Sequence, residues 1–279
     1  MRVYISADIE GTTGTVSWSQ TGGPNSGCYD WAFARRMMTH DVNAAIRGAL
    51  AAGADYILVK DSHGNSKNLL IDELEPGVEL MSGHGSGADG MMEGIDSSFD
   101  AAMLVGYHGM AGTLHGIMEH TISGMVHRCW VNGVETGEIG LSAATAGHYG
   151  VPLVFVSSDA AGCAEAASLV AGLKTAVVKH GIGRYMGRLL HPSVTGPLIE
   201  SAVAAAVREM AASPLTYRLP VTVKLEHNRS EETDAACLLD GWRRLDAFTI
   251  EYTAADWPTA HRATRRAMAV AGMGRNAHD

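Results

Sequence analysis

The residues best suited to chemistry lie near the start of the chain, in the segment VYISADIEG (residues 3–11). Its first residues are β-branched or aromatic and favour a buried strand, which ends on Asp8 and Glu10. Side chains two residues apart in an extended chain point to the same side, so both carboxylates can face one point. Crowding two acids together is costly unless a cation lies between them. A metal ion is the simplest such cation, and the alternative is a solvated strand end with two surface acids.

Two later apolar segments also end on side chains that bind metals. Residues 56–59 are followed by Asp61 and His63, and residues 101–105 are followed by His108. In open α/β sheets, ligands bind just outside the carboxyl ends of the strands. If the three strands are parallel neighbours, these side chains meet at one edge of the sheet, and the sequence predicts a metal centre there.

A further candidate ligand, Glu138, opens a predicted helix, where the helix dipole favours a carboxylate; that is also its purely structural role. The metal ligands that we predict are three acids and two imidazoles: Asp8, Glu10, His63, His108 and Glu138. One tetrahedral zinc needs fewer, and because a carboxylate can bridge, the set fits two metals that share Asp8. Oxygen and nitrogen ligands without cysteine also allow manganese or cobalt. We expect Asp61 to orient His63 and not to bind metal itself.

The elements that must position these residues alternate between strand and helix. Helices are predicted over residues 31–52, 137–148, 160–173 and 193–210, and further strands over residues 151–157 and 175–179. This alternation predicts an α/β fold with a mostly parallel sheet flanked by helices, over residues 1–212. Residues 213–279 are predicted to form a second, smaller α+β domain. The hairpin at residues 117–136 is a candidate to pack with that second domain.

Composition excludes several classes of partner. A net charge of −9 argues against a nucleic-acid backbone as the main partner. The sequence shows neither an apolar signal segment nor a run long enough to span a membrane, which predicts no membrane association. The four cysteines, Cys28, Cys129, Cys163 and Cys237, are scattered without a C-x-x-C pair. We interpret them as reduced, which predicts a cytoplasmic protein.

Several motifs resemble those of the zinc D-aminopeptidase family. The segment SADIEGTTG (residues 6–14) is similar to the family's S-x-D-x-E-G-x-x-G opening, and later segments follow in the family's order: KDSH (60–63), GYH (106–108), MEH (118–120) and GEIGL (137–141). The resemblance spans nearly the whole chain. It implies a di-zinc centre, with two zinc ions per subunit held by the five predicted ligands and bridged by Asp8, and a catalytic role for His120. It further implies a ring-shaped homodecamer whose active sites face an enclosed chamber.

The activity that the resemblance implies is hydrolysis of the amide bond of short peptides or amino-acid amides with D-amino-acid N-termini. A metal-bound water, with a pKa lowered to about 7, is the favoured nucleophile. His120 would act as general base or stabilise the oxyanion, and direct attack by His120 is the competing route. We expect His120 to start a strand that fixes its direction. His115, in the preceding loop, is the alternative catalytic imidazole.

Two other classes of function remain open from the sequence. One is a metal-dependent amidase that acts on other small amides or on L-peptides, and the other is a metal-stabilised ring protein without turnover. A peptidase needs an open metal position and a nearby acid or base, whereas a structural metal site is fully ligated. The presence of both His115 and His120 near the predicted site favours catalysis.

Overall fold

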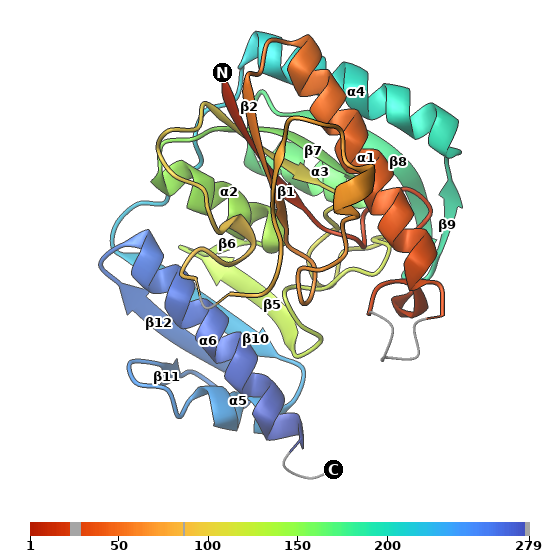
Figure 1. The fold of residues 1–279 in the computed structure, drawn as a ribbon. Coiled ribbons are helices and arrows are strands. Elements are labelled where there is room, and N and C mark those ends of the chain that lie inside the picture. The colour runs from red at the N-terminus through yellow and green to blue at the C-terminus, as the bar shows by residue number, and fades with distance from the viewer. Residues whose placement is uncertain (23–28, 86, 277–279) are drawn as a thin grey trace.

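The computed structural model describes residues 1–22, 29–85 and 87–276. Its larger unit is a seven-stranded sheet (Figure 1). In spatial order the strands are β3 (Glu79–Met81), β2 (Tyr56–Asp61), β1 (Arg2–Ala7), β4 (Ala101–Val105), β7 (Leu153–Asp159), β8 (Lys174–Gly183) and β9 (Met186–Leu189). Only β8 and β9 pair in antiparallel fashion, and all other neighbours are parallel. The predicted fold class, a mostly parallel sheet flanked by helices, is confirmed.

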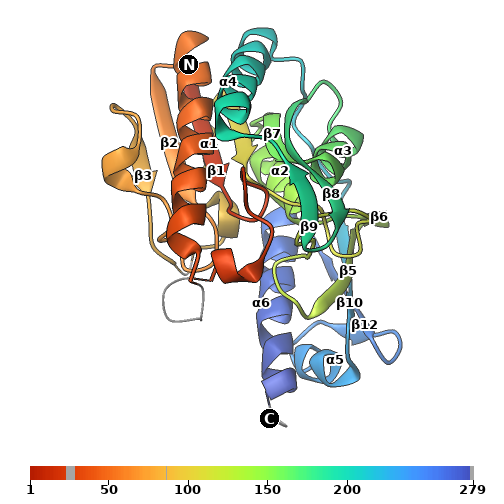
Figure 2. The ribbon, with the colours of Figure 1, turned by 90° about the vertical axis from the view of Figure 1, so that its right-hand side faces the viewer.

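Two pairs of helices cover the sheet (Figure 2). Helix α1 (Trp31–Ala51) packs on α4 (Pro192–Glu209), and α2 (Glu138–His148) packs near α3 (Ala160–Leu169). Connections between parallel strands are right-handed. The chain moves along the sheet in one direction from β1 to β2 and in the opposite direction from β4 through β7 to β8, so the helices of these connections lie on opposite faces. Short 3-10 helices complete this unit: η1 (Trp18–Gln20), η2 (Ile71–Glu73) and η3 (Gly90–Met92).

The smaller unit is a five-stranded antiparallel sheet. Its spatial order is β11 (Arg243–Arg244), β12 (Thr249–Ala254), β10 (Val221–His227), β5 (Val126–Val131) and β6 (Val134–Glu135). The hairpin β5–β6 precedes α2 in the chain, so this sheet draws its strands from two separate segments. Helices α5 (Ser230–Ala236) and α6 (Trp257–Asn276) pack on each other and on β10, and α6 also contacts α2.

The cores of the two units follow from the sequence patterns. Both β1 and β4 are buried on both faces, as expected for central parallel strands; β4 is entirely apolar, and β1 is apolar except for Arg2 and Ser6. In β10, buried and partly exposed residues alternate, because one face packs on α6 and the other does not. The two cores are linked by Trp257, whose indole N–H donates to the Thr145 hydroxyl of α2 at 3.1 Å.

One local prediction was wrong, and two had different bounds from those in the structure. The strand expected at His120 is a series of turns in which Met118 and Ile122 have φ of +56° and +62°, values incompatible with an extended chain. The helix expected over residues 160–173 ends at Leu169, because the backbone of Val170 is extended. The strand expected over residues 175–179 continues to Gly183 and turns into β9.

Two further observations concern the chain as a whole. No helix in residues 1–22, 29–85 and 87–276 combines the length and apolarity needed to cross a membrane. Cys129, Cys163 and Cys237 are free thiols, and Cys28 lies outside the described residues.

Candidate metal centre

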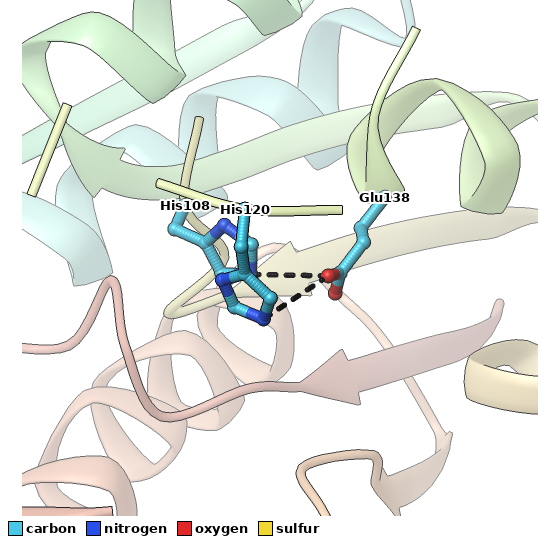
Figure 3. A group of neighbouring side chains, drawn as sticks. All are labelled: His108, His120 and Glu138. Atoms are coloured by element: carbon cyan, nitrogen blue, oxygen red, sulfur yellow. Dashed lines mark ion pairs between the residues drawn. The ribbon is translucent and has the colours of Figure 1, made fainter. Parts of the chain in front are cut away.

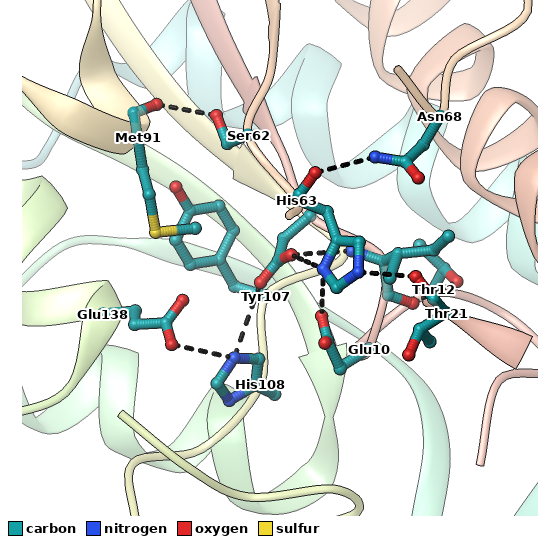
Figure 4. Close-up of polar contacts among 12 residues, drawn as sticks. Glu10, Thr12, Thr21, Ser62, His63, Asn68, Met91, Tyr107, His108 and Glu138 are labelled. Carbon is teal, nitrogen blue, oxygen red and sulfur yellow. Dashed lines mark hydrogen bonds and ion pairs between the residues drawn. The ribbon is translucent and has the colours of Figure 1, made fainter. Parts of the chain in front are cut away.

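The predicted metal ligands meet at the carboxyl ends of three neighbouring strands. Asp8 and Glu10 follow β1, His63 follows β2 and His108 follows β4. The chain leaves β1 towards β2 on one side, while β4 lies on the other, and such a switch point is where open α/β sheets bind ligands. Glu138, the first residue of α2, completes the group (Figure 4). All five predicted ligands are thus brought together.

Two glycines allow the loops after β1 and β4 to touch. A Cβ atom on Gly11 would lie 1.7 Å from the carbonyl oxygen of Tyr107, and one on Gly106 would lie 2.4 Å from that of Asp8. The backbone N–H of Gly11 donates to the carbonyl of Gly106 at 2.7 Å. This close approach holds Glu10 near the β4 loop, and no larger residue fits at either glycine.

The Asp8 carboxylate lies between two histidine–acid pairs. Its Oδ1 is 3.2 Å from Nδ1 of His63, and that nitrogen is 3.0 Å from Oε2 of Glu10. Its Oδ2 is 3.5 Å from Nε2 of His108, which is 3.3 Å from Oε1 of Glu138. With metal–ligand bonds of about 2.0–2.2 Å, two ligand atoms on one tetrahedral zinc lie roughly 3.3 Å apart. Each oxygen of Asp8 therefore has the spacing that a separate metal ion requires.

Backbone carbonyls fix which ring nitrogen of these histidines carries its hydrogen. A carbonyl oxygen only accepts hydrogen bonds, so Nε2 of His63 donates to the Thr21 carbonyl at 2.8 Å and Nδ1 of His108 donates to that of Gly109 at 2.9 Å. In the neutral ring the other nitrogen carries a lone pair, which in both residues faces the carboxylates. Two electron-rich groups that face each other need a cation between them, and a backbone partner on the far nitrogen is typical of metal-binding histidines.

The charges of the group also call for cations. Burial, followed by the nearby charge of Glu10, raises the pKa of Asp8 to about 7. Burial acts to lower the pKa of His63 and His108, but the carboxylates of Glu10 and Glu138 outweigh it and hold both well above the usual value. Among the described residues, Asp8 Oδ2, both carboxylate oxygens of Glu10 and His108 Nε2 are buried without a hydrogen-bond partner. Protons or metal ions must supply the positive charge, and the donor set fits zinc.

His120 lies beside this group, on the loop of residues 111–125. Its imidazole stacks on that of His108, with ring centres 4.0 Å apart and planes at 14° (Figure 3). Its Nδ1 donates to the Met118 carbonyl at 2.9 Å, which leaves Nε2 as an acceptor 3.5 Å from Oε1 of Glu138. Burial, followed by the neighbouring His108, lowers the pKa of His120. A neutral imidazole with a free nitrogen can accept a proton, and the same nitrogen could also reach a metal held with His108 and Glu138.

The alternative catalytic residue, His115, lies apart from this group. Its side chain is exposed and its Nδ1 bonds to the carbonyl oxygen of Ile182 at 3.0 Å. It does not belong to the residues that line the cavity at the metal centre.

Asp61 contacts the loop after β2 and not the imidazole of His63. Its buried carboxylate accepts the backbone N–H groups of Asn68 and Leu69 at 2.6 and 2.8 Å, and the Asn68 amide at 3.0 Å. The Asn68 amide also donates to the carbonyl of His63 at 2.9 Å. Asp61 can therefore influence His63 by fixing the loop that carries it.

Sequence reasoning missed the lysine that supports Glu10. Lys179, at the middle of β8, is fully buried, and its ammonium donates to the carbonyl oxygens of Glu10, Thr12 and Thr15 at 2.5, 2.9 and 2.6 Å. Burial lowers its pKa to about 8. The ammonium satisfies three carbonyls that no strand partner reaches, which fixes the turn after Glu10. The feature of the sequence that could have revealed this buried lysine is its place directly after the apolar pair Val177 and Val178.

Two buried acids that the sequence did not reveal hold the loop of His120. Asp159 accepts the backbone N–H of Ile117 at 2.6 Å, and Glu165 accepts that of Met110 at 2.7 Å. Arg184 donates to the Glu119 carbonyl at 2.9 Å. These contacts take the place of the strand pairing that the sequence predicted for this loop.

The metal centre forms one end of a cavity of about 690 Å³. Asp8, Glu10, His63, His120 and Glu138 all line it, whereas His108 does not. A cavity of this size is typical of sites for small molecules. The arrangement can thus hold a small substrate against a pair of metal ions, with the Nε2 of His120 beside it.

Several known proteins are similar to this chain over nearly its whole length. Residues 1–266 match the model of the D-aminopeptidase family. A D-aminopeptidase of Bacillus subtilis (strain 168) is 31% identical over 265 residues, which cover 94% of this chain and 95% of that protein. A solved structure, described as the Zn-dependent D-aminopeptidase DppA from Bacillus subtilis, a self-compartmentalizing protease, superposes with a TM-score of 0.93 at 31% identity over 98% of each chain. The match covers nearly the whole chain, and the protein therefore belongs to the D-aminopeptidase family of peptidases.

Proposed function

We propose that the enzyme is a zinc aminopeptidase that releases N-terminal D-amino acids from short peptides or amino-acid amides, with two zinc ions per subunit. The observation that carries this proposal is the place of the Asp8 carboxylate, whose two oxygens face His63 and His108 separately at 3.2 and 3.5 Å. Glu10 would complete one ligand set with His63, and Glu138 the other with His108. The zinc-dependent relative supports the choice of metal.

Zinc, when bound, supplies Lewis-acid chemistry, which polarises the scissile carbonyl and lowers the pKa of a water molecule to about 7. The chain itself contributes orientation and proton transfer. His120 Nε2 would take the proton of the attacking water and pass it to the leaving amine as the amide C–N bond breaks, because Nδ1 is already committed to the Met118 carbonyl. The lowered pKa of His120 keeps the ring neutral and able to accept it. Asp61 and Lys179 would act by holding the loops that carry His63 and Glu10.

The test is a substrate screen of zinc-loaded protein. We expect release of the N-terminal residue from D-aminoacyl amides and D-dipeptides, loss of activity on treatment with a chelator, and recovery when zinc is returned. Elemental analysis should give two zinc ions per chain. Equal turnover of L-substrates would instead identify a broader amidase or peptidase. A zinc-loaded protein that turns over none of them would fit a metal-stabilised structural role.

We also propose that the chain forms a closed homo-oligomer, a decamer by its likeness to the family, and that it acts in the cytoplasm. Several large apolar side chains of the β8–β9 hairpin are exposed by 53–63%: Ile182, Tyr185 and Met186. Exposed apolar patches mark interaction sites, and the relative described as self-compartmentalizing supports an enclosing assembly. The three free cysteines among the described residues agree with a reducing compartment.

The expected result for the assembly is a mass by light scattering of about ten times the 29.4 kDa of one chain, measured with zinc present. Met186→Glu places a charge on this exposed hairpin and should lower the mass. A mass equal to one chain at working concentration would contradict a closed assembly.

A further inference from the structure

The cavity has a second wall that carries cations. Away from the metal ligands it is lined by Lys60, in β2, and by Arg265, in α6, together with Glu93, which follows η3. Ser62 and Met91 also line the cavity, and the Ser62 hydroxyl donates to the Met91 carbonyl at 2.7 Å, a contact seen in Figure 4. The lining therefore includes two basic side chains, Lys60 and Arg265, in addition to the predicted metal ligands.

Lys60 is a buried cation without a close counterion. Lys60 is only 4% exposed, and its Nζ donates to the carbonyl oxygen of Asp61 at 2.5 Å. Across the parts of the chain that the structure describes, no carboxylate oxygen lies within 4.0 Å of this ammonium. The acids that act on it electrostatically are Asp61, whose carboxylate is bound by Asn68 and Leu69, and Glu93. Because a buried charge is costly without a partner, this position favours an anion.

Arg265 comes from the smaller unit and reaches into the cavity. Its Nη1 donates to the Gly87 carbonyl at 3.1 Å, which is the one hydrogen bond recorded for its guanidinium within the described residues. A guanidinium has five N–H donors, so most of the donors of Arg265 remain for another acceptor. Burial lowers the pKa of Arg265, while Glu93 and Asp89 oppose this effect without forming an ion pair to it in the described part of the chain. The Asp89 carboxylate instead accepts the hydroxyl of Tyr149 at 2.9 Å.

Two glycines make room for the charged groups of this wall. A Cβ atom on Gly90, whose φ is +64°, would lie 2.8 Å from the guanidinium carbon of Arg265. One on Gly87 would lie 1.7 Å from the carboxylate of Glu93. Larger residues would displace both charged side chains, so the backbone here is fitted to keep them at the cavity.

We propose that Arg265, supported by Lys60, binds the terminal carboxylate of the peptide substrate, so that the enzyme prefers short peptides with a free carboxyl end over blocked ones. This inference rests on the proposed peptidase function and adds the residues that recognise the carboxyl end of the substrate. A planar guanidinium matches a carboxylate through two parallel hydrogen bonds. The cavity volume of about 690 Å³ limits the fit to short peptides.

The test compares D-alanylglycine with D-alanylglycinamide on zinc-loaded enzyme, with release of D-alanine as the readout. A charged hydrogen-bonded pair predicts that kcat/KM is roughly 10- to 100-fold higher for the free carboxylate. Arg265→Met keeps the length and apolar packing of the stem, and should remove most of this preference, measured as the ratio of kcat/KM for the two peptides. Lys60→Met should reduce the preference less. Arg266→Met is the matched control, because Arg266 is the next residue of α6 and is exposed; it should keep the preference.

Several outcomes would overturn the carboxylate site. These are equal kcat/KM for both peptides in the unaltered enzyme, or a fall by one common factor for both in Arg265→Met, which would show a purely structural role. If Arg265→Met does not fold, Arg265→Lys keeps the charge but lacks the two parallel N–H donors of the guanidinium, and it should retain part of the preference. If neither peptide is cleaved, the proposed function fails, and calorimetric binding of the two peptides still decides the site. A binding preference for the carboxylate that Arg265→Lys weakens would support it, and equal binding would refute it.

Discussion

Replacing Asp8 by alanine should remove both zinc ions and the activity together. The carboxylate is 2% exposed, and its two oxygens are the atoms nearest to His63 Nδ1 on one side and to His108 Nε2 on the other. Without it, each predicted zinc site loses a ligand, and the group keeps only two of its three carboxylates, those of Glu10 and Glu138. We expect fewer than two zinc ions per chain by elemental analysis, and a loss of kcat greater than the roughly 10- to 100-fold typical of residues that only support a ligand.

Unfolding is not the expected cause of this loss. The raised pKa of Asp8 shows that its charged form is disfavoured by burial and by Glu10, so in zinc-free protein the residue costs stability. The zinc-free variant should therefore melt at the same temperature as the zinc-free parent or above it. The matched control is Asp61→Asn, which alters a buried acid that supports the loop of His63 without facing the metals. Two zinc ions retained in Asp8→Ala would refute the bridging role.

The convergence of Asp8, His63 and His108 could be predicted because simple rules determine it. Each residue follows an apolar run, and the carboxyl ends of parallel strands meet at one edge of the sheet. The pairing of β1 with both β2 and β4 bears out the assumption that these strands are neighbours. The alternation of strand and helix patterns predicts the parallel polarity, whereas the order of the strands was assumed.

The loop of His120 could not be predicted, because its conformation depends on distant residues. Met118 and Ile122 adopt left-handed backbone angles that neither residue type favours. The loop is instead held by Asp159 and Glu165, which are 42 and 55 residues further along the chain than their partners. The two basic side chains of the cavity, Lys60 and Arg265, were missed for a similar reason. They belong to different units, and only the fold brings them to the same cavity.

His120→Ala should abolish most turnover while both zinc ions stay bound. The ring is 13% exposed, is stacked on His108, and is fixed by its bond to the Met118 carbonyl, so Nε2 has a defined position at the cavity. General acid–base groups contribute roughly 10²- to 10⁴-fold to rate, and we expect kcat to fall in that range. The five predicted ligands remain, so elemental analysis should still give two zinc ions per chain. If zinc is lost instead, His120 belongs to the metal site with His108 and Glu138.

His115→Ala is the matched control for His120→Ala, because it removes the same ring from the same loop. Its side chain is exposed and bonded to the carbonyl of Ile182, at the β8–β9 hairpin, so the chemical step should be nearly unchanged. An effect confined to KM would indicate contact with longer substrates or with a neighbouring subunit. Measuring kcat and KM for both variants with zinc content confirmed separates the two histidines. If His115→Ala is inactive and His120→Ala is active, the loop must rearrange when substrate binds, and the catalytic imidazole is His115.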